Sequence, residues 1–283
     1  MFDHPLWRQK PVATAYRLLT CLVRQRVGGL NHAVVAYDGG RSKIEVDVRT
    51  PFGYSIYRYG LEDSDIAFVK SRLEPGALFV DGGAHIGLFT LAAAAQVGPA
   101  GRVIAFEPAQ ETRRNLIRNI ELSGFTWVDV RSNALADRCE SREFLTFGEQ
   151  AWGSSSFAPP KELPGARREV VETVTLDSAL EGVDRARIRL VKLDLEGAEL
   201  AALTGARNLL ETVRPDLLIE AEPEHLARQG ASVSEIFALL NEYGYRIYRA
   251  TGDASGEPYT VRVTGAADWE RDGTHPNLFA TVR

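Results

Sequence analysis

Residues 78–87 read Leu-Phe-Val-Asp-Gly-Gly-Ala-His-Ile-Gly, and this stretch decides the fold. An apolar strand runs into a turn of small residues and then into a helix, which is how a β-α-β unit begins. Gly83 and Gly87 permit tight backbone turns and the close approach of a ligand. The helix that follows presents free N–H groups to an anionic group. The stretch therefore predicts a ligand-binding turn at the edge of an α/β sheet.

The alternation of strand and helix continues along the rest of the chain. Gly98 and Gly124 mark the ends of two helices, and Ser234 is a candidate cap for a later one. We expect strands near 78–82, 102–107, 127–132, 188–194, 216–221 and 245–249, and helices near 87–97, 110–122, 197–211 and 233–242. Successive β-α-β units predict a doubly wound parallel sheet, to which 277–282 adds a closing strand.

The chain ahead of this sheet has a different pattern. Helical spacing of apolar residues predicts a helix over about 12–26, whose basic face either meets water or contacts a membrane surface or an anionic substrate. Short β-type runs at 33–37, 43–48 and 55–59 then predict a small antiparallel unit, and a lead-in helix covers about 62–73. We divide the chain into an N-terminal part, 1–76, and a main α/β domain, 77–283.

A long interval separates the third and fourth core strands. Two β-type runs within it predict an inserted β-hairpin over about 138–176, and long tips on α/β scaffolds often serve as lids or substrate walls. Trp152, Ser154 and Ser155 in the tip offer an aromatic ring and hydroxyl groups that suit a polar ring such as a sugar; the alternative is a polar loop without that role. The N-terminal helix and this hairpin are candidates for a homo-oligomer contact or a cover over the site.

The composition excludes several classes of protein. The 33 Lys and Arg residues against 38 Asp and Glu give a net charge of -5, which argues against a generally basic, nucleic-acid-coating surface. The two cysteines, Cys21 and Cys139, have neither disulfide-scaffold nor zinc-site spacing. The longest apolar stretch, around 86–95, is too short to span a bilayer. We expect a cytoplasmic protein without an integral membrane segment.

Glu107 at the tip of the second strand indicates a nucleoside cofactor. It follows Gly87 by twenty residues, and an acid at this place accepts hydrogen bonds from a ribose diol. The dinucleotide fingerprint GxGxxG is missing, and Asp81 at the head of the turn repels a pyrophosphate. A carboxylate there suits the amino and sulfonium groups of S-adenosylmethionine, which the sequence therefore favours over a nicotinamide dinucleotide.

A second charged segment follows the strand near 188–194. Strand alternation places Lys192 and Asp194 on one side, at the edge where open α/β sheets bind ligands, and Glu196 opens the next helix. In a purely structural interpretation Lys192 pairs with Asp194 and Glu196 complements the helix dipole. Further on, the acids Glu220, Glu222 and Glu224 precede His225 and either join Asp194 around a divalent cation or form an exposed acidic loop. No ligand spacing supports the cation, so we predict no metal site.

Four segments together carry a family resemblance. They are Tyr59-Gly60-Leu61-Glu62, the stretch Phe79 to Gly87, Phe106-Glu107-Pro108, and Leu193-Asp194-Leu195-Glu196-Gly197-Ala198-Glu199. Over about 55–282 the chain resembles the FkbM family of S-adenosylmethionine-dependent methyltransferases. The resemblance implies a class I, Rossmann-like sheet of seven strands with the last strand antiparallel. It also implies O-methylation of a hydroxyl on a small-molecule acceptor such as a sugar, a glycoside or another natural product.

The same resemblance implies roles for individual residues. The cofactor's methionine end is assigned to the first turn, its ribose to Glu107, its adenine to the following loops, and its methyl group to the neighbourhood of Asp194. The implied cofactor residues are Asp81, Gly83, Ala84, Gly87, Glu107, Pro108, Asn133, Ala134 and Asp194. Family members commonly have a β-branched residue in place of Gly82, so that Gly82 is expected to loosen the strand end, and Asn in place of His85.

Loss of a proton from an alcohol acceptor needs a nearby base. Asp194 is the leading candidate for it and His85 the second, while Glu196 and Glu220 are placed on the acceptor side. Two other classes stay open at this point: a nicotinamide-dependent oxidoreductase, and a non-catalytic partner protein with a cofactor-like fold.

Overall fold

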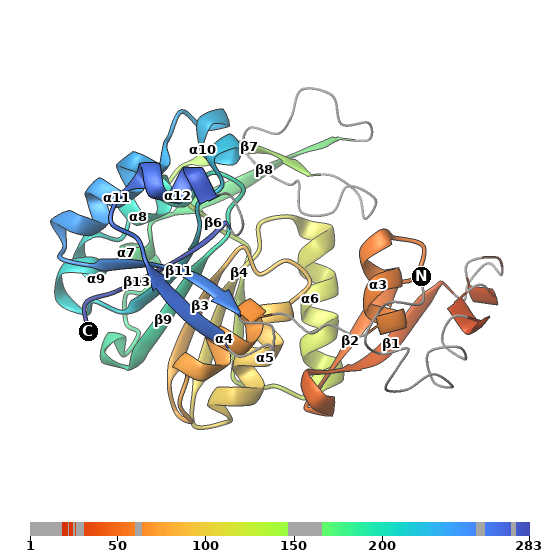
Figure 1. Ribbon diagram of the computed structural model, residues 1–283. Helices are drawn as coiled ribbons and strands as arrows, with labels where there is room; N and C mark the ends of the chain where they lie inside the picture. Colours follow the sequence, from red (N-terminus) through yellow and green to blue (C-terminus); the bar gives the residue numbers. More distant parts are fainter. Residues whose placement is uncertain are drawn as a thin grey trace.

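The centre of the molecule is an eight-stranded sheet with the order β12-β11-β13-β10-β9-β3-β4-β5 (Figure 1). The computed structural model describes residues 19–21, 23–24, 26, 31–59, 64–146, 166–252, 258–272 and 276–283. The strands of the sheet are β3 (Leu78–Gly82), β4 (Arg102–Phe106), β5 (Val128–Arg131), β9 (Ile188–Leu193), β10 (Asp216–Glu220), β11 (Arg246–Gly252), β12 (Pro258–Arg262) and β13 (Asn277–Thr281).

Seven of these strands have the predicted arrangement. Strands β10, β9, β3, β4 and β5 pair in parallel, and the closing strand β13 is antiparallel to both β10 and β11. The class I, Rossmann-like sheet with a reversed last strand is therefore confirmed. The eighth strand, β12, pairs antiparallel with β11 at the edge and was not predicted.

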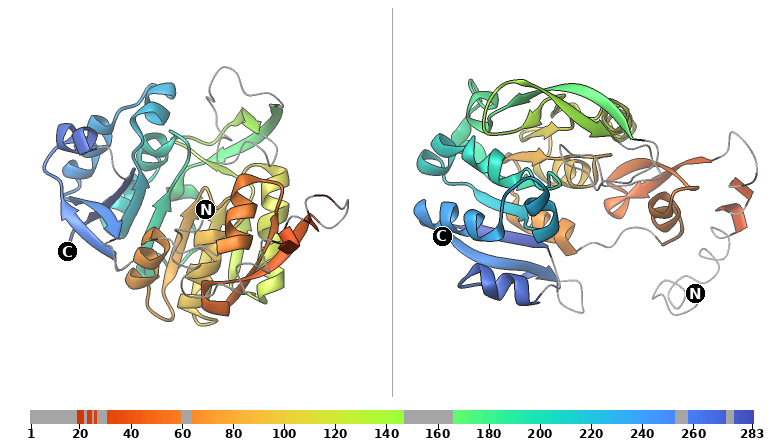
Figure 2. Two further views of the ribbon diagram at one scale, coloured as in Figure 1. Left: turned by 45° about the vertical axis from the view of Figure 1, so that its right-hand side comes forward. Right: turned by 90° about the horizontal axis from the view of Figure 1, so that it is seen from above.

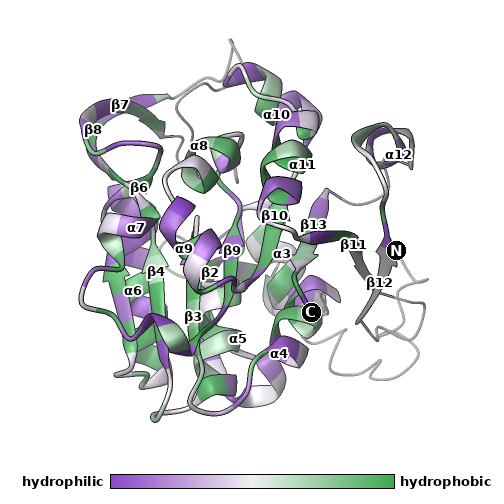
Figure 3. Ribbon diagram, turned by 90° about the vertical axis from the view of Figure 1, so that its left-hand side faces the viewer, coloured by the Kyte–Doolittle hydropathy of each residue, from purple (hydrophilic) through white to green (hydrophobic). Residues whose placement is uncertain are grey.

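Helices cover both faces of the sheet. One face carries α4 (Ser64–Arg72), α5 (Leu88–Val97) and α6 (Gln110–Ser123), and the other carries α7 (Leu176–Ala179), α8 (Glu199–Thr204), α9 (Arg207–Thr212) and α11 (Val233–Glu242) (Figures 1 and 2). Further helices are α3 (Pro51–Tyr59), α10 (Pro223–Arg228), α12 (Ala266–Asp272) and the short 3-10 turns Asp38–Gly40 and Arg185–Arg187. Because the parallel strands are covered on both sides, they read as continuous apolar runs, and Figure 3 shows their hydrophobic colouring.

Two predicted helix features are corrected. The single helix expected over 197–211 is two short helices, because the chain turns at Gly205, whose backbone packs so closely that a Cβ would lie 2.2 Å from the Ala136 carbonyl oxygen. The cap of α11 is Ser232 rather than Ser234, and its side chain accepts a hydrogen bond from the Glu235 amide. Gly98 and Gly124 do end α5 and α6.

The N-terminal part contains a two-stranded antiparallel ribbon of β1 (His32–Tyr37) and β2 (Ser42–Asp47). The strand expected over 55–59 is wrong, since these residues belong to helix α3 (Pro51–Tyr59). Thr50 starts the helix by accepting a hydrogen bond from the Gly53 amide at 3.0 Å, and Pro51 takes the first helical position. The helix expected over 12–26 lies largely outside the described residues.

The insertion is a hairpin of β7 (Ser141–Thr146) and β8 (Arg167–Val174), and β8 also pairs with the short β6 (Ala134–Leu135). Its tip, with Trp152, Ser154 and Ser155, lies outside the described residues. Within the described ranges, no helix combines the length and the apolar character that a bilayer crossing needs.

Asn119 of α6 joins the N-terminal ribbon to the turn after β3. Its side chain is wholly buried; its Oδ1 accepts from the Glu45 amide of β2 at 2.8 Å, and its Nδ2 donates to the Ile86 carbonyl at 2.9 Å. The residue therefore satisfies two backbone groups that belong to separate parts of the chain.

Asn119→Ala is expected to lower the free energy of unfolding by about 1–3 kcal/mol, because a buried donor and a buried acceptor lose their partner. Urea unfolding followed by circular dichroism measures the change. Asn115→Ala, the same change one turn earlier at a half-buried position, is the control. Equal stability of the two variants would show that Asn119 does not hold the two parts together.

Candidate functional site

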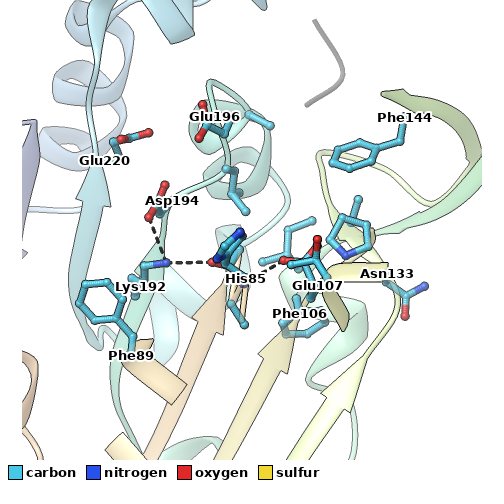
Figure 4. Close-up of a pocket in the computed structure, with 18 of the residues that line it drawn as sticks. His85, Phe89, Phe106, Glu107, Asn133, Phe144, Lys192, Asp194, Glu196 and Glu220 are labelled. Atoms are coloured by element: carbon cyan, nitrogen blue, oxygen red, sulfur yellow. Dashed lines mark hydrogen bonds and ion pairs between the residues drawn. The ribbon is translucent and has the colours of Figure 1, made fainter. Parts of the chain in front are cut away.

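A cavity of about 380 Å³ lies at the carboxyl edge of β3, β4, β9 and β10 (Figure 4). This edge is the ligand-binding edge of doubly wound sheets. The lining residues come from the turns after β3 and β9, from the ends of neighbouring strands and the loops that follow them, from helices α3, α5 and α6, and from the inserted hairpin. They are Phe52, Gly83, Ala84, His85, Leu88, Phe89, Phe106, Glu107, Pro108, Thr112, Asn133, Ala134, Leu135, Phe144, Lys192, Asp194, Leu195, Glu196, Ala198 and Glu220.

The turn after β3 packs directly against the turn after β9. Gly83 has φ +73°, and a Cβ on it would lie 1.9 Å from the carbonyl oxygen of Asp194, so only glycine fits. At Gly82 a Cβ would lie 2.9 Å from Leu135 Cδ1 and 3.0 Å from Leu193 Cδ2. Leucine side chains thus occupy the space that a branched residue would take, and the strand end is filled rather than loosened.

Lys192 lies between two carboxylates at the wall of the cavity. Its Nζ is 3.4 Å from Asp81 Oδ1 and 3.2 Å from Asp194 Oδ2, and it donates to the Gly83 carbonyl at 3.0 Å. Burial alone would lower the pKa of Lys192, but the charges of Asp194 and Asp81 outweigh it and raise the pKa. The ammonium therefore stays charged and joins the two motifs.

Asp81 does not line the cavity. Its side chain is fully buried and accepts a hydrogen bond of 2.6 Å from Thr90, besides the ion pair with Lys192. Burial raises the pKa of Asp81, and Lys192 and Thr90 oppose that effect. The role implied for Asp81 at the cofactor stays a prediction; in the structure its carboxylate contacts Lys192, which does line the cavity.

Glu107 does lie at the cavity, with its side chain 6% exposed. Oε2 accepts from the His85 amide at 2.9 Å and Oε1 from the Ala109 amide at 3.0 Å, so the carboxylate is fixed in orientation. Burial raises the pKa of Glu107 to about 7, against the lowering effect of these two amides. Its remaining lone pairs are available to the hydroxyl groups of a ribose.

His85 takes a left-handed backbone conformation, with φ +51°. Asn is the residue most tolerant of this region after glycine, which explains why His85 stands where the family commonly has Asn. Burial lowers the pKa of His85 to about 4, although the charge of Asp194 opposes this. The ring is therefore neutral near pH 7.

Beyond Glu107, the cavity has a mostly apolar wall. Pro108, Asn133 and Ala134 all line it, together with Phe106 below and Phe144 from β7 (Figure 4). Flat apolar surfaces of this kind suit an adenine ring. The three residues implied for the adenine are therefore brought together.

The turn after β9 is held by a residue that the sequence reasoning did not use. Glu199 is 1% exposed and accepts from the Leu195 amide at 2.6 Å and the Gly197 amide at 3.2 Å. Glu196 does not open the next helix as expected: it lies in the turn with φ +55°, and α8 begins at Glu199. The sequence feature that could have pointed to the role of Glu199 is its place as a second acid, three residues after Glu196.

Glu196 and Glu220 both line the cavity, and His225 of α10 lies beside both. His225 Nδ1 is 3.2 Å from Glu196 Oε2 and 3.3 Å from Glu220 Oε2. Burial and the charges of Glu220 and Asp194 raise the pKa of Glu196 to about 8. Glu222 and Glu224 take no part in this group.

The cavity thus collects most of the predicted site. The predicted site residues that line it are Gly83, Ala84, His85, Glu107, Pro108, Asn133, Ala134, Asp194, Glu196 and Glu220. Gly87 instead caps α5 with φ +102°, and a Cβ on it would lie 2.7 Å from Leu116 Cδ1. Three features were not predicted, because they depend on contacts distant in sequence. They are the ion pair of Lys192 with Asp81, the hydrogen bond from Thr90 to Asp81, and the parts of the cavity wall formed by Phe52 and Phe144.

The family model described as "Methyltransferase FkbM domain" matches residues 81–247, more than half of the chain. Methyltransferase sdnD of Sordaria araneosa is 27% identical over 70% of this chain and 85% of its own length. Methyltransferase 1 of Beauveria bassiana is 32% identical over 46% of this chain and 58% of its own length.

Among solved structures, methyltransferase FkbM from Methylobacillus flagellatus matches 97% of this chain and 60% of its own, with 16% identity and a TM-score of 0.43. The residues present fit the family's cofactor, because Glu107 offers a fixed carboxylate for a ribose and the neighbouring acids suit a sulfonium. Methyl transfer therefore prevails over hydride transfer as the chemistry of this site. From the family match and the site together, this chain belongs to the FkbM family of S-adenosylmethionine-dependent methyltransferases.

Proposed function

We propose that the protein methylates a hydroxyl oxygen of a small molecule such as a sugar, a glycoside or another natural product. The observation that carries this proposal is the single cavity that runs from Glu107 to Asp194, Glu196 and Glu220. One end is built for a nucleoside, and the other offers carboxylates to a polar acceptor. The family resemblance supports an oxygen acceptor of this class.

The cofactor-binding half of the proposal assigns one task to each end of the nucleoside. Glu107 holds the ribose hydroxyls, and Pro108, Asn133 and Ala134 border the adenine. Gly83 and Ala84 border the methionine end, with Asp194 beside the sulfonium. Attraction between a carboxylate and a sulfonium in a partly buried site is stronger than in water.

The transfer is a displacement at carbon. A lone pair of the acceptor oxygen forms the new C–O bond, the S–C bond breaks, and its electron pair leaves the donor as a neutral thioether. The protein mainly aligns the two reactants, and the acceptor's proton passes to a base. We assign that base to Asp194, which lies at the cavity wall with its side chain 38% exposed. His85 stays the second candidate: burial lowers its pKa to about 4, so its neutral ring accepts a proton less readily than an ordinary imidazole.

The acceptor half combines Glu196, Glu220 and Phe144. We add Trp152, Ser154 and Ser155 from the sequence of the hairpin tip, since β7 and β8 lead to that tip from the cavity edge. A cytoplasmic location and the absence of a nucleic-acid partner stay predictions of the sequence.

Asp194→Asn is expected to reduce turnover by about 10²–10⁴-fold while S-adenosylhomocysteine still binds, since a positioned base contributes about that much. A labelled-methyl assay over a panel of hydroxylated acceptors measures turnover, and calorimetry measures binding. Asp137→Asn, at a surface carboxylate paired with Arg138, is the matched control. Near-normal turnover with intact binding would remove Asp194 from the base role. No methyl transfer by the unaltered protein to any acceptor, despite binding, would favour a non-catalytic partner.

Glu107 gives cofactor binding a pH dependence. Ribose hydroxyls donate to the ionised carboxylate, whose pKa is about 7, so S-adenosylhomocysteine is expected to bind roughly tenfold more weakly at pH 6 than at pH 8. Glu107→Gln is expected to bind weakly at both pH values with a flat profile. Calorimetry at several pH values tests this, and an equal pH dependence in both proteins would contradict it.

The stability of the ligand-free protein depends on pH in the opposite direction: it falls as the pH rises, whereas cofactor affinity increases. The pKa of Glu107 is raised above its unfolded value of 4.5, so its contribution to stability is fully present below pH 4.5 and is lost as the pH rises through about 7. Glu107→Gln is expected to remove that loss, which urea unfolding at pH 5 and pH 8 can measure.

A further inference from the structure

Three side chains at the acceptor end converge from three separate elements. Glu196 comes from the turn after β9, Glu220 ends β10, and His225 lies in α10. One donor atom from each lies within 4.8 Å of the other two. Glu196 and Glu220 also line the cavity, so the group faces the place where an acceptor would bind (Figure 4).

The hydrogen bond between His225 Nδ1 and Glu220 Oε2 accounts for only one of the two close carboxylate contacts. The His225 Nδ1 carries at most one proton, yet it faces a carboxylate oxygen at 3.2 Å and another at 3.3 Å. A charge-assisted N–H···O bond is shorter, at about 2.7–2.9 Å. Donor atoms that share an ion with bonds of about 2.1 Å lie about 3.0–3.4 Å apart, which matches both distances.

The backbone is shaped to bring these donors together. Gly197 has φ +105°, and a Cβ on it would lie 2.2 Å from the His225 carbonyl oxygen, so α10 can approach the turn only because residue 197 is glycine. Glu199 fixes the same turn from below through the amides of Leu195 and Gly197. The positions of Glu196 and His225 are therefore set by packing, independently of their charges.

The nearby cations do not satisfy the two carboxylates. The Lys192 ammonium is held by Asp81 and Asp194. Arg228 acts electrostatically on Glu196 and on His225, but no ion pair within 4.0 Å is described between it and either acid of the group. Burial and the mutual repulsion of the two acids raise the pKa of Glu196 to about 8, and a divalent ion among the three donors would favour the ionised acids.

We propose that Glu196, Glu220 and His225 bind a divalent metal ion of the Mn²⁺ type, with further coordination positions open to the cavity. Two carboxylate oxygens and one imidazole nitrogen suit a first-row divalent ion better than Ca²⁺, which prefers oxygen donors alone. This proposal departs from the sequence prediction of no metal site. The cation weighed there was held by Asp194 with Glu220, Glu222 and Glu224, a different set of ligands.

The role of the ion rests on the proposed function, although its binding does not. Hydroxyl groups of the acceptor would fill the open positions, and a metal-bound hydroxyl loses its proton more readily. The ion would hold the oxygen near Asp194, the carboxylate assigned above as the base. An acceptor with two neighbouring hydroxyls, which can chelate the ion, is the substrate class that fits.

The test is Mn²⁺ binding to chelator-treated full-length protein, measured by the paramagnetic resonance signal of free Mn²⁺ and by calorimetry. The proposal expects one Mn²⁺ per chain for the unaltered protein and binding weakened about tenfold or more in Glu220→Gln and His225→Gln. Glu224→Gln, an exposed acid of the same helix, is the matched control and should bind like the unaltered protein. Circular dichroism checks that each variant is folded.

Two results would overturn the site: no binding at about 1 mM Mn²⁺, or equal binding by all four folded proteins. S-adenosylhomocysteine binding is measured on the same samples, so that loss of the cofactor site is seen separately from loss of the metal site. If Mn²⁺ binds as expected and chelation leaves methyl transfer unchanged, the site stands and its catalytic role is rejected.

Discussion

The buried ammonium of Lys192 is the interaction on which the site depends. It lies between Asp81 of β3 and Asp194 after β9, and it also donates to the carbonyl of Gly83. An unpaired buried carboxylate would cost several kcal/mol, so the charge of the fully buried Asp81 depends on the lysine. Asp81 is fully buried and Asp194 is partly open to the cavity. The lysine contacts both, so it connects a carboxylate of the core with one at the cavity wall. The charge at the cavity wall thus depends in part on Asp81, a buried residue that does not line the cavity.

Close backbone packing adds a second constraint. Gly83 lies against the Asp194 carbonyl, and Gly197 lies against the His225 carbonyl. These two contacts place the turn after β3, the turn after β9 and helix α10 at fixed distances from one another. Side chains on each turn can therefore meet at one cavity with little freedom to move apart, which is the preorganisation that an alignment-based reaction needs.

Much of the fold was predictable because the signals are local and periodic. The apolar run ending in Gly82, the glycine turn and the helix stop at Gly98 each depend on neighbours in sequence, and the parallel sheet follows from their alternation. The failures come from competition between local signals. Residues 55–59 alternate like a strand, but Thr50 and Pro51 start a helix that includes them. The helix after residue 197 breaks where Gly205 meets the Ala136 backbone, a contact distant in sequence.

The site shows the same division between local and distant information. A motif reveals which residues have chemistry to offer, and Glu107 and Asp194 were found in this way. It does not reveal depth: Asp81 and Glu107 are both acids at strand ends, yet Asp81 lies beneath the cavity and Glu107 at its wall. Depth is decided by what packs above each side chain, here the Gly82–Gly83 turn and Lys192 over Asp81. The acid at the first position of this motif therefore contacts Lys192 rather than the cavity, and Lys192 connects it to Asp194 at the cavity wall.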